Sequence, residues 1–395
     1  MQRGLSVLVA AAAATLFATA AGAQEVRIAR QFSMGYLQFN VMEHDKLLEK
    51  HAAALGLKDV KIAWSIFNGP DAMNNALISD SIDIVAGGVP GLLTLWNRTH
   101  GTANEVKGIS ALSSQPFLLN TRSENIKSIA DLKDSDRIAV PAVKVSVQAV
   151  TLQMAAAKLF GQKNFGKLDP LTVSMSPPDS TIALLTGTGE INNVFGVPPF
   201  QQQQLEKPGI RTILNSFDVM DGPHTFTVAW TSARFREKNP VLYKALIAAL
   251  KEATDIVDKD RKKAASFWIE DVKSKLPLEK VTDVISGPQV KWTMEPLNTM
   301  KYANFMHSVG SLKEATDVVD KDRAKAAGFW IEDVKSKLPL DKVTAVISGP
   351  QVKWTMTPLA TMKYAAFMHS VGSLKEAPKS WKDLFFPEVH DLNGS

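Results

Sequence analysis

The sequence contains no cysteine among its 395 residues. Without a thiol, the chain forms no disulfide, holds no zinc or iron–sulfur cluster through cysteine, and has neither a cysteine nucleophile nor a lipid-modified cysteine. The excess of one sign of charge over the other is also small, because 45 Lys and Arg residues against 40 Asp and Glu residues give a net charge of only +5. We therefore expect no surface basic enough to make nucleic acid a partner.

The short motifs of several common chemistries are also missing. The sequence has no G-x-x-x-x-G-K-[ST] for ATP hydrolysis, no G-x-S-x-G for a nucleophilic serine and no H-E-x-x-H for zinc. The glycine-rich run Gly187-Thr188-Gly189 precedes a strand pattern instead of following one, which favours a loop over a phosphate cradle. Its seven histidines are scattered. These absences predict a protein that is not an enzyme and needs no cofactor or metal.

Long apolar runs are confined to the amino terminus. Residues 1–23 contain Arg3, an apolar run of 16 residues and the small residues Ala21-Gly22-Ala23. This pattern is typical of a secretory signal peptide cleaved after Ala23. The alternative, a membrane anchor, is disfavoured because spanning a bilayer takes roughly 20 apolar residues. We expect a mature protein that is exported to the periplasm and is not embedded in the membrane.

A tandem repeat lies in the carboxy-terminal part. Residues 251–312 recur at 313–374 with a shift of 62 residues and eight differences, among them Ile256 against Val318. Two long copies do not fit a solenoid, which stacks three or more shorter repeats. The similarity indicates a recent duplication. We expect the copies to compete for one docking site, with the surplus helices outside the binding cleft.

Strand and helix patterns alternate from residue 25 to about 235, which predicts sheets of mostly parallel strands flanked by helices. The expected strands are 26–31, 60–67, 82–86, 107–112, 117–121, 137–140, 171–176, 191–197, 211–214 and 225–230. The expected helices include 36–55, 71–79, 147–160 and 240–257. Beyond Arg236 the chain has a helical pattern almost throughout.

Three segments resemble successive blocks of a known family. They are "VRIARQFSMGYLQFNVMEHDKLLEKH", "GPDAMNNALISDSIDIVAGGVPGLL" and "SIADLKDSDRIAVPAVKVSVQAVTLQMAAAKLFG". They are similar to periplasmic substrate-binding proteins of ABC importers, of the nitrate, sulfonate and taurine (NMT1/THI5-like) type. The resemblance covers residues 25–312 and the later "SWKDLFFPEV". It implies the type II periplasmic-binding-protein fold, in which two α/β lobes are joined by two crossing strands and hold a ligand between them.

On this chain, the resemblance implies a signal peptide followed by two interleaved lobes. The expected divisions are 1–23 for the signal peptide, 24–114 and 222–250 for lobe 1, 115–221 for lobe 2, 251–312 and 313–374 for the repeat copies, and 375–395 for a tail. The crossings fall near Ser113-Ser114-Gln115 and Asp221-Gly222-Pro223. Small and turn-forming residues there suit a hinge. The helical carboxy-terminal part is expected to pack on lobe 1.

The ligand is expected beyond the carboxyl ends of the strands, in loops that lead into helices. The candidate ligand-binding residues are Gln31, Ser33, Met34, Tyr36, Phe67, Asn68, Gly87, Gly88, Val89, Ser114, Lys144, Ser146, Phe195, Val197 and His224. The paired glycines allow close approach of the backbone to a ligand, or simply make a tight turn. Tyr36 and Phe67 are ligand contacts or core residues.

A helix amino terminus favours an anionic group, and Lys144 beside Ser146 adds a cation and a hydroxyl at such a terminus. The alternative is that Lys144 points to solvent and Ser146 only caps its helix. His224, at the second crossing, is the one histidine expected at the ligand. Lys144 and Ser146 at this terminus favour an oxyanion such as a sulfonate or a carboxylate.

The leading hypothesis is a monomeric periplasmic binding protein that delivers a small, anionic organic solute (sulfonate-, taurine- or nitrate-like) to a membrane permease with a separate ATPase subunit. One alternative is an enzyme related to the pyrimidine-synthesising proteins of thiamine biosynthesis, which share the fold and need a reactive Lys and His. The other is a solute-sensing subunit of a receptor.

Overall fold

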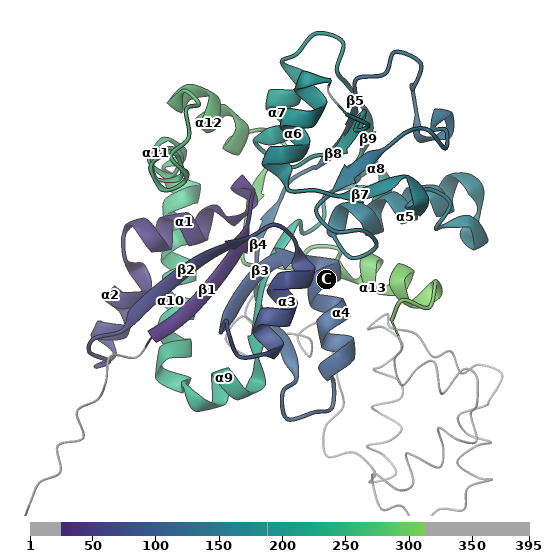
Figure 1. The fold of residues 1–395 in the computed structure, drawn as a ribbon. Helices are drawn as coiled ribbons and strands as arrows, with labels where there is room; N and C mark the ends of the chain where they lie inside the picture. Colours follow the sequence, from purple (N-terminus) through teal and green to yellow (C-terminus); the bar gives the residue numbers. More distant parts are fainter. Residues whose placement is uncertain (1–24, 188, 313–395) are drawn as a thin grey trace, which may run out of the picture.

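The computed structural model describes residues 25–187 and 189–312. The predicted signal peptide, the second repeat copy and the predicted tail lie outside these residues. Two β-sheets organise the described chain (Figure 1). We call the elements around the six-stranded sheet lobe 1 and those around the five-stranded sheet lobe 2.

Lobe 1 is built on the sheet with strand order β11-β4-β10-β3-β1-β2. Its strands are β1 (Glu25–Gln31), β2 (Lys61–Phe67), β3 (Ile84–Gly88), β4 (Val106–Ser114), β10 (Thr227–Ser232) and β11 (Lys291–Trp292). Its helices are η1 (Met34–Tyr36), α1 (Leu37–His44), α2 (Leu47–Ala54), α3 (Pro70–Ile78), α4 (Val89–Thr99), α9 (Ala233–Lys238), α10 (Pro240–Lys259), α11 (Arg261–Val272), α12 (Leu278–Ile285) and α13 (Thr299–Ser308).

Lobe 2 is built on the sheet with strand order β7-β6-β8-β5-β9. Its strands are β5 (Leu118–Thr121), β6 (Ile138–Val140), β7 (Thr172–Ser174), β8 (Asn193–Phe195) and β9 (Arg211–Asn215). Its helices are η2 (Ile129–Asp131), α5 (Val147–Phe160), η3 (Gln162–Asn164), η4 (Asp169–Leu171), α6 (Pro177–Thr186), α7 (Phe200–Leu205) and α8 (Ser216–Val219).

The predicted α/β fold with two lobes is confirmed, although each sheet is mixed. Strand β1 pairs in parallel with β2 and β3, whereas β10 is antiparallel to β3 and β4. The reason is the path of the chain. It leaves lobe 1 at the end of β4 and returns along β10, so the returning strand runs in the opposite direction.

Each of the ten expected strands overlaps an observed strand, and the two-residue strand β11 was not predicted. The expected helix over residues 36–55 is wrong in detail, because η1, α1 and α2 replace it. The break between α1 and α2 contains Lys46, whose positive φ of 50° does not occur inside an α-helix. In "SIADLK", Ser128 and Asp131 form a reciprocal capping box around η2.

One face of the lobe 1 sheet is covered by α1, α2, α10 and α11, which pack on one another. A buried ion pair anchors the first repeat copy there. Arg30 on β1, whose side chain is 4% exposed, contacts Asp271 on α11 at 2.5 Å and Glu43 on α1 at 2.8 Å. Asn40 donates a second hydrogen bond to Asp271.

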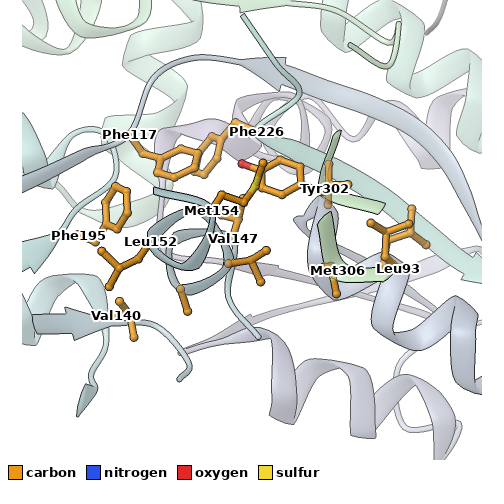
Figure 2. Packing of buried hydrophobic residues seen from close by; sticks show 14 of the residues in the cluster. Leu93, Phe117, Val140, Val147, Leu152, Met154, Phe195, Phe226, Tyr302 and Met306 are labelled. Carbon is orange, nitrogen blue, oxygen red and sulfur yellow. The ribbon is translucent and has the colours of Figure 1, made fainter. Parts of the chain in front are cut away.

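Helix α13 differs from the other carboxy-terminal helices, because it contacts both α4 of lobe 1 and α5 of lobe 2. Tyr302 on α13 shares a hydrogen bond of 2.9 Å with Thr151 on α5. Figure 2 shows Tyr302 in one apolar cluster with Phe117 and Phe226 from the two crossings. This core therefore continues from one lobe into the other.

Candidate ligand-binding site

A small cavity of about 20 Å³ lies between the lobes, and we call it the front cavity. It is lined by Gln31, Phe32, Ser33, Tyr36, Pro70, Gly88, Gly91, Pro141, Val145, Ser146, Val147, Gln148, Pro177, Val197 and Phe226. These residues come from strand-to-helix loops and helix starts of both lobes and from the return crossing. The space holds about one water molecule. The lobes are therefore shut in this structure, and a solute enters only after they part.

Close contacts across the cleft hold the lobes together. The Met34 amide donates to the Pro198 carbonyl at 2.9 Å, and Ser33 Oγ donates to the same oxygen at 3.0 Å. A Cβ atom added to Gly88 would lie 2.6 Å from Val147 Cβ in lobe 2. One added to Gly69 would lie 2.6 Å from the Pro141 carbonyl oxygen. The two glycines thus let the backbone of lobe 1 approach lobe 2.

The amino terminus of α5 supplies backbone donors to the front cavity. Ser146 caps this helix, because its Oγ accepts from the Ala149 amide and its carbonyl accepts from the Val150 amide. Within the described part of the chain, the Val147 and Gln148 amides have no hydrogen-bond partner. The positive end of the helix dipole adds to these donors, so this corner favours an anionic group.

Helix α6 also points its amino terminus at the front cavity but offers fewer donors. Proline has no amide hydrogen, and α6 begins with Pro177 and Pro178. Its next two amides, of Asp179 and Ser180, are already bonded to Ser176. The α5 terminus is therefore the stronger anion site of the two.

The side chains lining the front cavity are all neutral, because none is Asp, Glu, Lys, Arg or His. Gln31 Nε2 is buried and has no hydrogen-bond partner among the described residues. Burial raises the pKa of Tyr36 above its ordinary value, so its hydroxyl stays protonated. Together with Gln148, these groups give the site amide and hydroxyl hydrogen-bonding capacity without a countercharge. The rings of Phe32 and Phe226 make its apolar walls.

Several sequence-predicted residues line the front cavity, namely Gln31, Ser33, Tyr36, Gly88, Ser146 and Val197. Three more are buried close to it in lobe 1. Met34 makes the contact with Pro198, and Val89 begins α4. A Cβ on Gly87 would meet Gln31 Nε2 and Trp230 at 2.7 Å, so this glycine accommodates packing inside lobe 1.

The other predicted residues do not line the front cavity. Lys144 and Asn68 are exposed, and Phe67 is half-buried against the core. Ser114 is buried at the first crossing, and its Oγ has no partner among the described residues. Phe195 packs on Phe117 with ring centres 5.4 Å apart.

His224 is fully buried at the return crossing and lies in an aromatic cluster with Phe117, Phe217 and Tyr302. Its ring nitrogens contact the Thr225 carbonyl at 3.0 Å and Ser216 Oγ at 3.1 Å. Burial lowers its pKa to about 4, so the ring is neutral at pH 7. In the shut structure this histidine belongs to the hinge region and not to the cavity wall.

Sequence reasoning missed some lining residues. Gln148 lies one position inside α5, and Pro177 begins α6, a helix that supplied no candidate from the sequence. Phe226 comes from the return crossing, next to the predicted His224. The only available signal for Pro177 was the rule that strand-to-helix loops face the ligand, because β7 also leads into a helix.

Residues 25–187 and 189–312 contain no group of three or more His, Asp or Glu residues placed to hold a metal ion. None of their helices has both the length and the apolar character that a membrane crossing requires.

Solved structures with the same fold include two sulfonate-binding proteins and a nitrate-binding protein. The alkanesulfonate-binding protein SsuA of Xanthomonas axonopodis pv. citri, bound to MOPS, has a TM-score of 0.57 at 17% identity, covering 73% of this chain and 94% of its own. SsuA of Escherichia coli, a periplasmic aliphatic sulphonate binding protein, has 0.54 at 19%, covering 74% and 94%. The nitrate-binding protein NrtA of Synechocystis PCC 6803 has 0.55 at 15%, covering 82% and 91%.

These identities are low, so the likeness shows the periplasmic-binding-protein fold alone. No curated protein sequence matches the chain significantly. A sequence model described as the NMT1-like family matches residues 18–269, which is more than half of the chain. The chain therefore belongs to the NMT1-like family.

Proposed function

We propose that this protein is the periplasmic solute-binding component of an ABC importer. It works as an exported monomer that captures a small organic anion and delivers it to a membrane permease served by a separate ATPase subunit. The observation that carries the proposal is the front cavity, in which loops of two lobes meet on a neutral, donor-rich site. The likeness in fold to the sulfonate-binding SsuA proteins and to the nitrate-binding protein NrtA supports it.

The chemistry of the front cavity favours a single negative charge. The Val147 and Gln148 amides, with the Tyr36 hydroxyl nearby in the lining, present donors to a sulfonate or carboxylate. Since no lining side chain is cationic, the charge is stabilised by oriented dipoles, which suit a monoanion better than a dianion. Phe32 and Phe226 favour a ligand with an apolar part.

Capture requires motion of the lobes. The cavity of about 20 Å³ is too small for a sulfonate, so the solute binds while the lobes are apart. Contacts with both lobes form only when they close around it. Binding therefore shifts the population towards a closed form, and the permease recognises that form.

The test is a thermal-shift and calorimetric screen of the mature protein, beginning at Gln24. The panel contains nitrate, taurine, alkyl and aryl sulfonates, carboxylates and pyrimidines. A monoanionic organic solute at 100 times its Kd should stabilise the fold by about 2.7 kcal/mol. The proposal fails if no anion binds and a neutral pyrimidine does.

Variants of the mature protein locate the anion. Ser146→Ala removes the cap of α5, so we expect the free energy of unfolding to fall by about 1 kcal/mol, the usual value of such a cap. We expect solute binding to weaken as well, because the first turn that presents the Val147 and Gln148 amides is less firmly held. Lys144→Ala is the matched control, because Lys144 is exposed two residues away and does not line the front cavity. A large loss in Lys144→Ala with none in Ser146→Ala would move the anion to the lysine.

The enzyme alternative is less well supported. A reaction of that kind needs a reactive Lys and His at the ligand, and the lining of the front cavity contains neither. His224 is buried outside it and uncharged at neutral pH. We expect every solute that binds to be recovered chemically unchanged, and mass spectrometry after prolonged incubation checks this.

A further inference from the structure

A second cavity lies between the lobes, and it is far larger than the first. Its volume is about 410 Å³, within the usual range for small-molecule sites. We call it the back cavity and define it by Gln115, Pro116, Gln202, Asp283, Val284 and Pro288, which line it. One wall is the first crossing with α7 of lobe 2. The other is the end of α12 with the loop that follows it.

The two cavities lie on opposite sides of the crossings. In the lobe 1 sheet, the front cavity lies beyond β3 and β1, whereas the back cavity lies beside β11. Strands β4 and β10, which lead to and from the crossings, lie between them in the strand order. Figure 1 shows α12 near α7 on one side, where Lys280 and Glu206 form an ion pair of 2.9 Å.

This arrangement couples the cavities mechanically. A rotation about the crossings that parts the walls of the front cavity also changes the spacing between α7 and the end of α12, which form walls of the back cavity. A molecule in the back cavity resists that movement. It therefore favours the shut state of the lobes, to the extent that it binds this state better.

The polar atoms of the back cavity without partners are hydrogen-bond acceptors. Gln115 is 0% exposed; its Nε2 faces Ser113 Oγ at 3.5 Å, and its Oε1 has no partner among the described residues. Gln202 Oε1 is likewise buried and without a partner. Asp283, at the exposed rim, adds a carboxylate that forms no ion pair with another described residue. A complementary ligand carries N–H donors and a positive charge.

The remaining surface of the back cavity is apolar. Pro116, Val284 and Pro288 offer flat or branched hydrocarbon faces, and Leu118 and Val290 extend them. We propose that the back cavity is a second binding site, for a small organic cation with an apolar body, and that its occupation holds the lobes shut. This site is separate from the front cavity and does not depend on what the front cavity binds.

The probe is benzamidine, a flat amidinium with an apolar ring, and the matched control is benzoate, which has the same shape and the opposite charge. We expect calorimetry on the mature protein to detect benzamidine and not benzoate. Asp283→Ala should weaken benzamidine about two- to fivefold, the effect of losing an ion pair at an exposed position. The fold tolerates this change, because Asp283 is exposed and forms no ion pair with another described residue.

Three variants separate the possible results. Gln202→Leu should also weaken benzamidine, whereas Asp255→Ala, which removes an exposed carboxylate on α10, should not. Gln148→Ala alters the front cavity and should leave benzamidine binding unchanged. Equal binding of benzoate, or loss of benzamidine binding in Gln148→Ala alone, overturns the second site.

The coupling has its own measurement. Because the chain lacks cysteine, Ala72→Cys on α3 and Ile182→Cys on α6 accept a pair of spin labels specifically. Both positions are exposed, on opposite lobes at the front. We expect saturating benzamidine to shift the label distances towards the shorter population without any solute in the front cavity. An unchanged or longer distance overturns the coupling.

Discussion

Gly88 is the position where a single methyl group tests the closing motion. Its φ of −74° and ψ of 152° suit any residue, so Gly88→Ala causes no backbone strain. The three atoms nearest to the added Cβ all belong to Val147 of lobe 2, at 2.6, 2.9 and 3.5 Å. The clash is therefore between the lobes and not within lobe 1.

The size of the effect follows from these distances. Carbon atoms in good contact lie roughly 3.5–4.0 Å apart. The walls must separate by about 1 Å at this point, which also lengthens the Met34–Pro198 hydrogen bond of 2.9 Å. Overpacking of this kind costs about 1–3 kcal/mol, and we expect solute binding to weaken by about 5- to 150-fold.

The assay is the calorimetric Kd for the tightest solute of the screen, with thermal unfolding as a check on the fold. Gly166→Ala is the control, because Gly166 does not line the front cavity and its added Cβ would meet only the Asp169 side chain of the same lobe, at 3.3 Å. Adding Val147→Gly to Gly88→Ala removes the clashing Cβ and should restore part of the affinity. An unchanged Kd in Gly88→Ala would refute the idea that this contact forms in the bound state.

Three further variants or conditions probe the surroundings of the site. Gly87→Ala places a Cβ against Gln31 and Trp230 of its own lobe, so it should lower the unfolding free energy by about 1–3 kcal/mol in urea, with or without solute. His224 has a folded pKa of about 4 against 6.5 in the unfolded chain, so the unfolded state binds the proton first as pH falls. Its share of the stability, about 3 kcal/mol, is present above pH 6.5 and should be lost towards pH 4, and His224→Gln should flatten that part of the pH profile. Tyr302→Phe removes a hydrogen bond to Thr151 and should cost about 1 kcal/mol in chemical denaturation.

The strands and the loops of the site were predictable for a local reason. Alternating and apolar runs mark strands, and strand ends in α/β sheets face the ligand, so Gln31, Ser33 and Ser146 could be placed at the cavity from the sequence. What the loops do not reveal is the direction of each side chain. Val197 reaches the cavity, whereas Phe195, two residues earlier, packs in the core.

The position of Lys144 was also not predictable from the sequence, because this expected ligand contact does not line the front cavity. Its backbone has a positive φ of 66°, and its side chain is exposed. It lies near Asp169, whose pKa is raised because burial outweighs the opposing effects of the Gln153 hydrogen bond and the Lys144 charge. No sequence pattern predicts that a lysine adopts the left-handed region, since few non-glycine residues do. The bridging position of α13 was equally hidden, because an amphipathic helix reveals its apolar face but not which lobe covers it.

The repeat raises the question of which copy the fold uses. None of the eight positions that differ is buried in the first copy. The anchoring residues Asp271 and Tyr302 recur unchanged as Asp333 and Tyr364. The second copy therefore carries the same contact groups, and the difference must come from what precedes each copy.

That difference favours the first copy. Helix α10 begins before the repeat and buries Leu242 and Leu246, whereas the residues 62 places later are Asn304 and Ser308. The second copy would have to dock without this apolar half-helix. We therefore propose that the first copy is the docked one, and that deleting residues 313–374 leaves stability and solute binding unchanged.

Asp271→Ala decides the matter when it is made in both the full chain and the chain lacking residues 313–374. It removes a carboxylate 2.5 Å from the buried Arg30 guanidinium, which stays paired with Glu43 at 2.8 Å, so we expect a loss of about 1.5–3 kcal/mol, the value of a hydrogen bond to a charged group. If the first copy alone fits the site, urea unfolding shows the same loss in both chains. A clearly smaller loss in the full chain would mean that Asp333 replaces Asp271. The second copy would then dock instead of the altered first copy, and the loss would be limited to the difference in free energy between the two docked forms.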